Sequence, residues 1–234
     1  KTLKFNHFIS PFAFDGSAKD NNIPLLEDRD GSIWVASTKG LARFIPATSS
    51  FKVFKHDKND ANSISDDNIT ALFQDQYGGL WIGTSSGLNY LAAGAHGFVH
   101  YFHDYANEAS LSNNFIRAIV SDKQGNLWIG TEGGGLNRMS RQQKNNIYFE
   151  RFSAEKSGLN HNINLALTID NSDNLWIGTL SGINKTDLKK RNFRLYRKND
   201  SPYSVDLAGN VIASLYVDDK GLIWIGNCGQ GLNI

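Results

Sequence analysis

The stretch Leu80–Thr84 reads LWIGT, and the same five letters recur at Leu127–Thr131 and at 175–179. Two looser copies, IWVAS at Ile33–Ser37 and IWIGN at Ile223–Asn227, stand on either side of these three. Each copy holds one tryptophan, and consecutive tryptophans lie 47 or 48 residues apart: Trp34, Trp81, Trp128, Trp176 and Trp224. A period of about 40 to 50 residues is typical of repeat architectures. The sequence therefore predicts five copies of one structural unit.

A second recurring feature is an aspartate six residues before each tryptophan: Asp28, Asp75, Asp122, Asp170 and Asp218. Three residues before the tryptophan stands a glycine, except in the fourth copy, where Asp173 takes its place. The D-x-x-G pattern follows a short apolar segment and predicts a hairpin turn, because aspartate caps turn amides and glycine tolerates a positive φ. A catalytic feature needs one asymmetric constellation, so the five tryptophans and five aspartates are interpreted as structural.

The remainder of each period predicts four antiparallel strands. Two residues after the tryptophan comes a small residue, Ala36 in the first copy and glycine in the others, which lets a neighbouring unit approach closely. A second turn ending in glycine leads into segments such as GLNYL at Gly87–Leu91, and an aromatic-rich segment such as FVHYF at 98–102 follows. The predicted fold is an all-β propeller of five four-stranded antiparallel blades, with the tryptophans packed between blades.

Composition excludes several classes of function. The 234 residues include 24 basic and 23 acidic ones, so the formal net charge of +1 favours neither nucleic acid nor an acidic membrane surface as a partner. Cys228 is the single cysteine, which rules out an intrachain disulfide, and it is expected to be an incidental residue in a turn. No apolar run approaches the roughly 20 residues of a membrane span. Any membrane contact is therefore expected through segments outside this chain.

Two alternatives stay open for the two ends of the chain. The first ten residues, KTLKFNHFIS, are similar to the fourth-strand segments, and the fifth copy lacks a fourth strand of its own. An N-terminal strand that completed the last blade would close a five-bladed ring and remove unpaired edges. Otherwise residues 1–234 are a fragment of a larger propeller rather than one complete propeller domain.

The pattern I/L-x-x-L-x-x-D-x-x-G-x-L-W-I-G-T-x-x-G-L-N resembles the two-component regulator propeller repeat. The resemblance covers essentially the whole chain, although Ala36, Ser37 and Asp173 depart from the pattern and five copies are fewer than the seven blades typical of the family. It implies a periplasmic sensor domain of an inner-membrane hybrid histidine kinase or diguanylate cyclase. It also implies a small-molecule or oligosaccharide ligand, because several relatives sense oligosaccharides, and a homodimer of the parent protein.

The long connections from each fourth strand to the next first strand are the predicted ligand-binding elements. They span 10–22, 55–68, 103–114, 153–162 and 197–210, are polar and non-repeating, and are expected to share one face with the turns between second and third strands. Aromatic rings beside amides and carboxylates suit sugars. The candidate residues are Phe12, Phe14, His56, Asp57, His103, Tyr105, His161 and Tyr203. The alternative is that these side chains fasten the connections to the propeller.

Three functions compete at this point. A ligand-sensing input domain without catalysis or cofactor is favoured. A protein-interaction scaffold is the first alternative, and a propeller glycosidase is the second. The glycosidase needs two converging carboxylates, and the acidic residues outside the repeat pattern, Glu132 and Glu155, do not pair in the sequence. The histidines lack a short ligand spacing, so no metal site is predicted.

Overall fold

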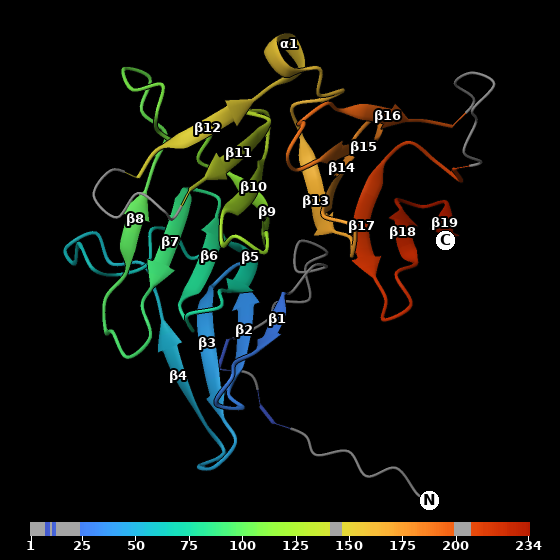
Figure 1. The fold of residues 1–234 in the computed structure, drawn as a ribbon. Coiled ribbons are helices and arrows are strands. Elements are labelled where there is room, and N and C mark those ends of the chain that lie inside the picture. Colours follow the sequence, from blue (N-terminus) through green and yellow to red (C-terminus); the bar gives the residue numbers. More distant parts are fainter. Residues whose placement is uncertain (1–7, 10, 13–23, 141–146, 199–206) are drawn as a thin grey trace, which may run out of the picture.

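The chain is folded into five antiparallel β-sheets arranged around a common centre (Figure 1). The structure, a computed structural model, describes residues 8, 9, 11, 12, 24–140, 147–198 and 207–234. In these residues, four sheets have four strands and the last sheet has three. Within each sheet the strands are neighbours in the order of the sequence, and the first strand lies nearest the centre (Figure 1). This arrangement of blades confirms the predicted all-β propeller.

The strand bounds follow the repeat closely. The first sheet contains β1 (Leu25–Glu27), β2 (Ile33–Ser37), β3 (Gly40–Ile45) and β4 (Ser50–Phe54). The second contains β5 (Ile69–Gln74), β6 (Leu80–Thr84), β7 (Gly87–Leu91) and β8 (Val99–Tyr101). The third contains β9 (Ile116–Ser121), β10 (Leu127–Thr131), β11 (Leu136–Met139) and β12 (Phe149–Phe152). The fourth contains β13 (Asn164–Ile169), β14 (Asn174–Thr179), β15 (Gly182–Asp187) and β16 (Arg194–Tyr196), and the last contains β17 (Ile212–Val217), β18 (Ile223–Asn227) and β19 (Gly231–Asn233).

One short helix, α1 (Ala154–Ser157), interrupts the connection between the third and fourth sheets. The sequence analysis predicted a loop there. With four residues, this helix is far too short to traverse a bilayer, and the described part of the chain has no helix that is long and apolar enough to do so.

The repeated aspartate holds both the first turn and the tryptophan of its own sheet. In the second sheet, Asp75 accepts hydrogen bonds from the backbone amides of Tyr77 (2.8 Å) and Gly79 (3.1 Å). Its second oxygen accepts a hydrogen bond from Trp81 Nε1 at 2.9 Å. The same indole bond recurs in the other four sheets at 2.8–3.2 Å. The six-residue spacing between aspartate and tryptophan is therefore the spacing of a side-chain hydrogen bond across the turn.

Asp173 takes the backbone conformation of the glycine that it replaces. Its φ is 61°, and the φ of Gly78 at the equivalent position is 82°. Aspartate is among the few non-glycine residues that adopt this left-handed region readily. The departure from the repeat pattern therefore leaves the turn intact.

The tryptophans lie at the junctions between consecutive sheets. Trp81 and Trp128 are 1% and 0% exposed. Trp81 packs in one apolar cluster with Ile116 and Ile129 of the third sheet, and Trp128 packs with Leu175 of the fourth. Burying side chains of this size stabilises the fold by about 25 cal/mol per Å² of apolar surface.

The glycine after the tryptophan marks a close approach to the next sheet in the second, third and fourth sheets. A Cβ built on Gly83 would lie 2.7 Å from Ile116 Cγ2, and a Cβ built on Gly130 would lie 2.9 Å from the backbone oxygen of Asn164. Ile116 and Asn164 belong to the first strands of the following sheets. Only a glycine allows these contacts without moving the neighbouring sheet.

The last sheet leaves one face open to solvent. Leu232 is 59% exposed, whereas Leu88 and Leu136 at the equivalent position of inner sheets are 0% exposed. Phe8 packs on Phe44 of the first sheet, with ring centroids 4.5 Å apart. Residues 1–7 lie outside the described part of the chain, so completion of the last sheet by an N-terminal strand stays a prediction.

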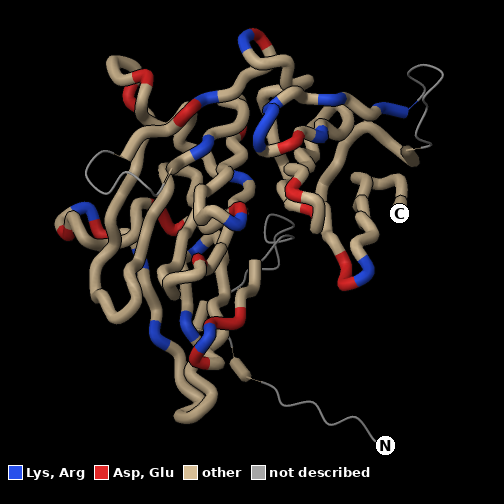
Figure 2. Tube along the Cα trace, viewed as in Figure 1, with Lys and Arg blue, Asp and Glu red and all other residues tan. Residues whose placement is uncertain are grey.

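Charges of both signs are interspersed along the trace (Figure 2). This distribution agrees with the formal net charge of +1. It provides no large field of one sign that would attract a nucleic acid.

Candidate functional site

The long connections and the turns between second and third strands lie at the same edge of the sheets, as predicted. Ser85 and Ser86 in the turn after β6 each donate a hydroxyl hydrogen bond, 2.6 Å long, to Asp66 Oδ2 in the connection before β5. The amide of Gly40 in the first sheet donates to the carbonyl of Asp67 at 2.8 Å. We call this edge, formed by the connections and these turns, the connector face.

The prediction that the connections do not repeat is wrong for their second halves. Among the described residues of four connections there is one buried aliphatic side chain each, with exposed fractions of 0–2%: Ile64, Leu111, Leu159 and Leu207. These side chains join the apolar clusters between the sheets. Because these segments are polar overall, a single aliphatic residue in each copy did not indicate a repeat as clearly as the LWIGT motif did.

An asparagine on the third strand of the following sheet fastens each of these connections. Its Oδ1 accepts a hydrogen bond from a backbone amide of the connection in all four cases, at 2.9–3.0 Å. The asparagines are Asn89, Asn137, Asn184 and Asn233, and the first three are 0% exposed. A buried amide group needs such partners, since a lone polar group in the core is costly. The asparagine of the repeated letters GLN is thus an anchor for the connector face.

A second polar residue closes the base of each connection. Its Oδ1 accepts a hydrogen bond from the backbone amide of the residue that starts the connection, at 2.6–2.8 Å. The acceptors are Asp67, Asn114, Asn162 and Asn210. Each connection is therefore a closed loop with two fixed points, which we call the anchor and the clasp.

The candidate histidines serve these loops. His56 Nδ1 lies 2.8 Å from the carbonyl of Ile64, and His103 Nδ1 lies 2.6 Å from the carbonyl of Leu111. His161 Nδ1 accepts a hydrogen bond from the amide of Ile163 at 2.9 Å. In the same way, Asp57 Oδ1 accepts one from the amide of Asn59 at 2.9 Å. These contacts support the alternative that the side chains fasten their own connections.

The aromatic candidates differ among themselves. Tyr105 is 96% exposed, and its ring meets the ring of His103 edge to face with centroids 4.4 Å apart. Phe12 is 5% exposed. Phe14 and Tyr203 lie outside the described residues. Among the predicted ligand-binding residues, the described structure thus brings Tyr105 and His103 together and leaves Tyr105 available to a ligand.

The connector face also holds positions at which the repeat dictates the backbone but not the side chain. Ser85, Glu132 and Cys228 each donate a backbone amide hydrogen bond to the residue before the first strand of their own sheet, at 2.9–3.1 Å. The acceptors in the second and third sheets are the carbonyls of Asn68 and Phe115. The side chain at each turn position is therefore free to differ between sheets.

Only the third sheet places a charged pair at these positions in the described structure. Arg117 on β9 forms an ion pair with Glu132, and its guanidinium lies 4.5 Å from the ring centre of Phe115. About a third of each charged side chain is exposed, 36% for Arg117 and 32% for Glu132. The second sheet has the small polar residue Ser85 at the turn position, and the fourth has Leu180, which is 37% exposed.

Phe115 and Arg117 lie at the start of β9, one of the strands nearest the centre of the arrangement (Figure 1), and Glu132 and Leu180 follow β10 and β14. The side chain at the turn position is thus polar in the second sheet, charged in the third and apolar in the fourth. We call Phe115, Arg117, Glu132 and Leu180 the mouth cluster. Glu132 was predicted only as a candidate catalytic carboxylate, and the other three residues were not predicted. All four differ from the residues at the equivalent positions of the other copies.

The anchor can be tested by replacing Asn137 with alanine. We expect a loss of about 2 kcal/mol in the free energy of unfolding, because the part-buried Ser112 amide loses its hydrogen bond to the Oδ1 of Asn137, a side chain that is 0% exposed. Hydrogen exchange at the Ser112 amide should accelerate while exchange in β10 stays slow. Asn171→Ala, at an exposed asparagine, is the matched control. Unchanged exchange at Ser112 would contradict the anchor role.

Acid should weaken the hairpin turns. Burial by itself raises the pKa of the Asp170 carboxyl, but hydrogen bonds from the Trp176 indole and the amides of Asn174 and Ser172 outweigh it, so the pKa lies below 3.8. A carboxyl whose pKa is lower in the folded state contributes stability that is complete above the unfolded pKa and is lost as the pH falls through the folded pKa. The free energy of unfolding, measured with urea, should therefore fall below about pH 4, and less steeply in an Asp170→Asn variant. Equal slopes would contradict this role.

Comparison with known proteins agrees with this description. The profile of the two-component regulator propeller family matches residues 63–86, 110–133 and 206–229, and each match runs from a connection to the turn after a tryptophan strand. No curated protein sequence matches the chain. Among solved structures, two from B. thetaiotaomicron are extracellular domains of proteins assigned to the hybrid two-component systems. They share 23% and 20% sequence identity with this chain, with TM-scores of 0.77 and 0.72, over 91% and 90% of its length.

The chain spans 28% and 26% of the lengths of those two domains. A more distant structure is an enzyme, virginiamycin B lyase from Staphylococcus aureus, with 11% identity, a TM-score of 0.61, and coverage of 89% of this chain and 67% of the lyase. At these identities the structures share the propeller fold. Three of the five copies therefore match the repeat of the two-component regulator propeller family, and the chain shares the propeller fold with these structures.

Proposed function

We propose that the chain is a ligand-sensing input domain of a membrane-anchored bacterial signalling protein, located outside the cytoplasm, in the periplasm, and binding without catalysis. The observation that carries the proposal is that different residues of the connector face hold its loops and remain exposed to solvent. Repeated residues hold the loops, and the mouth cluster and Tyr105 remain to contact a ligand. The shared fold with extracellular domains of hybrid two-component systems supports the location. The kinase or cyclase output and a homodimer of the parent protein belong to the same proposal.

A saccharide suits the proposed site. Tyr105 offers a flat exposed ring, and the Arg117–Glu132 pair offers donors and acceptors for hydroxyl groups. A catalytic reading is disfavoured by the partners of the two acidic candidates. Glu132 is paired with Arg117, and Glu155 accepts a hydrogen bond from Asn162 at 2.8 Å. A propeller glycosidase requires two converging carboxylates that act on one glycosidic bond.

Calorimetric titration of the purified chain with a panel of neutral and acidic oligosaccharides tests this function. We expect at least one saccharide to bind and to be recovered unchanged by mass spectrometry. Glu132→Gln and Tyr105→Ala should weaken binding about tenfold, since each removes one polar or stacking contact. Glu108→Gln, at an exposed carboxylate of the same connection as Tyr105, is the control. A flat response across the panel contradicts sugar sensing, and conversion of the saccharide contradicts binding without catalysis.

The alternative of a protein-interaction scaffold has one specific observation in its favour. Tyr216, Leu222 and Leu232 of the last sheet region are 62%, 47% and 59% exposed. Exposed apolar residues gathered in one sheet are typical of interaction surfaces. Sedimentation at increasing concentration distinguishes the two cases, because a scaffold face of this kind should drive association that Leu232→Ser abolishes.

A further inference from the structure

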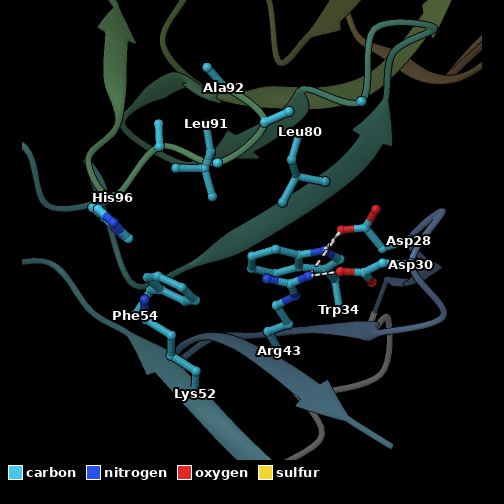
Figure 3. Close-up of a pocket in the computed structure, with 14 residues that line it drawn as sticks. Asp28, Asp30, Trp34, Arg43, Lys52, Phe54, Leu80, Leu91, Ala92 and His96 are labelled. Carbon is cyan, nitrogen blue, oxygen red and sulfur yellow. Dashed lines mark hydrogen bonds and ion pairs between the residues drawn. The ribbon is translucent and has the colours of Figure 1, made fainter. Parts of the chain in front are cut away.

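A cavity of about 260 Å³ lies between the first and second sheets (Figure 3), and its lining includes no residue of the mouth cluster. Its apolar wall includes Trp34, Phe54, Leu80 and Leu91. Leu80 and Trp34 are 3% and 2% exposed, so this wall belongs to the core between the sheets. The segment 92–95, alanine and glycine only, forms another side of the cavity and is exposed. Small side chains at this connection keep the cavity open.

The equivalent junction between the second and third sheets shows what closes such a space. There the residue of the third strand is Tyr90, whose ring lies 4.4 Å from the ring of Trp81. A Cβ on Gly79 of the same sheet would lie 2.4 Å from that ring, so the tyrosine ring packs tightly at this position. In the first sheet the equivalent residue is Arg43, whose guanidinium lies 5.4 Å from the centre of the Trp34 ring. Arg138 and Lys185 lie over Trp128 and Trp176 at the same position of the third and fourth sheets, so Tyr90 is the exception among the four. The cavity is therefore bounded by a basic residue of the repeat, Arg43, and by the small connection 92–95.

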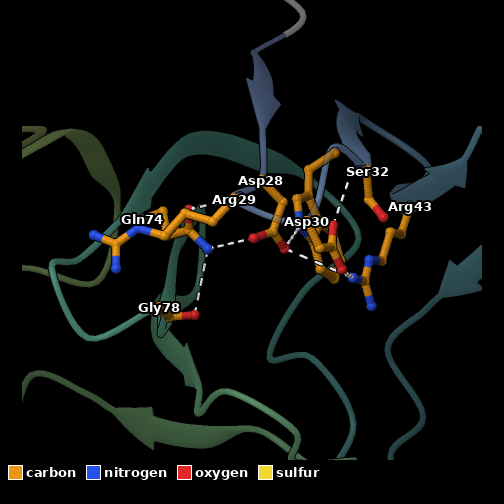
Figure 4. A network of polar contacts seen from close by, with 8 residues as sticks. Asp28, Arg29, Asp30, Ser32, Arg43, Gln74 and Gly78 are labelled. Carbon is orange, nitrogen blue, oxygen red and sulfur yellow. Dashed lines mark hydrogen bonds and ion pairs between the residues drawn. The ribbon is translucent and has the colours of Figure 1, made fainter.

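The acidic groups beside the cavity are already engaged (Figure 4). Asp30 forms an ion pair with Arg43 and accepts a hydrogen bond from the amide of Ser32 at 2.9 Å. Asp28 accepts hydrogen bonds from Trp34 Nε1 at 3.0 Å and from Gln74. These two carboxylates thus have their charge compensated by the protein.

The basic groups at the other end of the cavity are not compensated in this way. Figure 3 places Lys52 and His96 on the same side, near Phe54 and opposite Asp28 and Asp30. Lys52 Nζ lies 5.0 Å from the centre of the Phe54 ring, and Lys52 has no ion pair within the described ranges. Both Lys52 and His96 are exposed and line the cavity. One end of the cavity therefore offers N–H donors without an anionic partner, next to an apolar wall.

We propose that this cavity binds a small monocarboxylate with a flat apolar body. The carboxylate pairs with Lys52 and His96, and the body packs on Phe54, Leu91 and the edge of Trp34. A second carboxylate on the ligand would lie near the Asp30 carboxylate, whose side chain is 55% exposed. Because the two negative charges would repel each other, dicarboxylates are disfavoured. This site is independent of the proposed sensing at the mouth cluster.

The indole N–H of Trp34 reports on this cavity in the intact chain. In a ¹⁵N-tryptophan sample, titration with phenylacetate should shift the indole signal of Trp34, assigned with a Trp34→Phe variant, and leave those of the buried Trp81 and Trp128 in place. Acetate, which lacks the body, and benzyl alcohol, which lacks the charge, should bind at least about tenfold more weakly. Glucuronate tests whether a sugar can supply the body in place of an aromatic ring. Terephthalate tests the exclusion of a second charge.

Two variants locate the site. Lys52→Gln should weaken phenylacetate binding about tenfold, because one charge-assisted hydrogen bond is lost. Ala93→Phe should abolish binding by filling the cavity, whereas Ala47→Phe, at the exposed equivalent connection of the first sheet, should leave it unchanged. An unshifted Trp34 signal up to the solubility limit overturns the proposal. Binding that is equal in all three variants overturns it as well, and neither result bears on saccharide binding at the mouth cluster.

Discussion

Replacing Trp128 with alanine should lower the free energy of unfolding by about 3–5 kcal/mol. The side chain is fully buried, packs with Leu175 and Ile177 of the next sheet, and donates its N–H to Asp122 at 3.2 Å. Truncation would leave a cavity at the junction of the third and fourth sheets and remove a partner from a buried carboxylate. Urea denaturation followed by circular dichroism measures the change.

The last sheet supplies the control for this prediction. Trp224 occupies the same position of the repeat and makes the same hydrogen bond, to Asp218 at 2.9 Å, but its ring is only half-buried. Trp224→Ala should therefore cost about 1 kcal/mol. Equal losses for the two substitutions would show that the hydrogen bond to aspartate, rather than packing between sheets, carries the contribution of tryptophan.

Replacing Gly130 with valine should cost about 3 kcal/mol or more, or prevent folding. The new Cβ would lie 2.9 Å from the backbone oxygen of Asn164, and a backbone atom on β13 cannot turn aside as a side chain can. The third and fourth sheets would have to separate, which exposes apolar surface between them. Thermal denaturation and the yield of folded protein measure the effect.

Gly226 provides the matched comparison. It is the equivalent glycine of the last sheet, and a Cβ there would meet first the hydroxyl of Ser214, an exposed side chain of its own sheet that can rotate away. Gly226→Val should therefore cost much less than Gly130→Val. A similar cost at both positions would mean that strand geometry, not the approach of the next sheet, requires the glycine.

The architecture was predictable because its determinants are local and repeated. The aspartate, the tryptophan and the small residue after it lie within nine residues, and the hydrogen bond from tryptophan to aspartate recurs five times. The anchors were harder to predict, since Asn137 and Ser112 are 25 residues apart in the sequence and their pairing becomes visible only when the connection folds back on the sheet. The GLN motif predicted a strand, but it did not indicate a role for the asparagine.

The candidate site was predictable to a smaller extent. The choice of the connector face followed from topology, and its turns and connections do meet there. The roles of His56, His103 and His161 could not be predicted from the sequence. A histidine can bind a ligand or form a hydrogen bond within its own loop, and the residue type alone does not distinguish the two. The mouth cluster became recognisable when equivalent positions were compared across sheets, where Glu132 and Leu180 replace Ser85.

The clasp and the anchor leave the content of each connection open to change. Between the third and fourth sheets, the clasp from Ala154 to Asn162 encloses the helix α1, whereas the equivalent clasp from His103 to Asn114 encloses turns. The same two attachment points thus accept inserts of different secondary structure. The frame of the sheets therefore tolerates connections of different structure between the same two attachment points, so a substitution or insertion inside one connection need not disturb the neighbouring sheets.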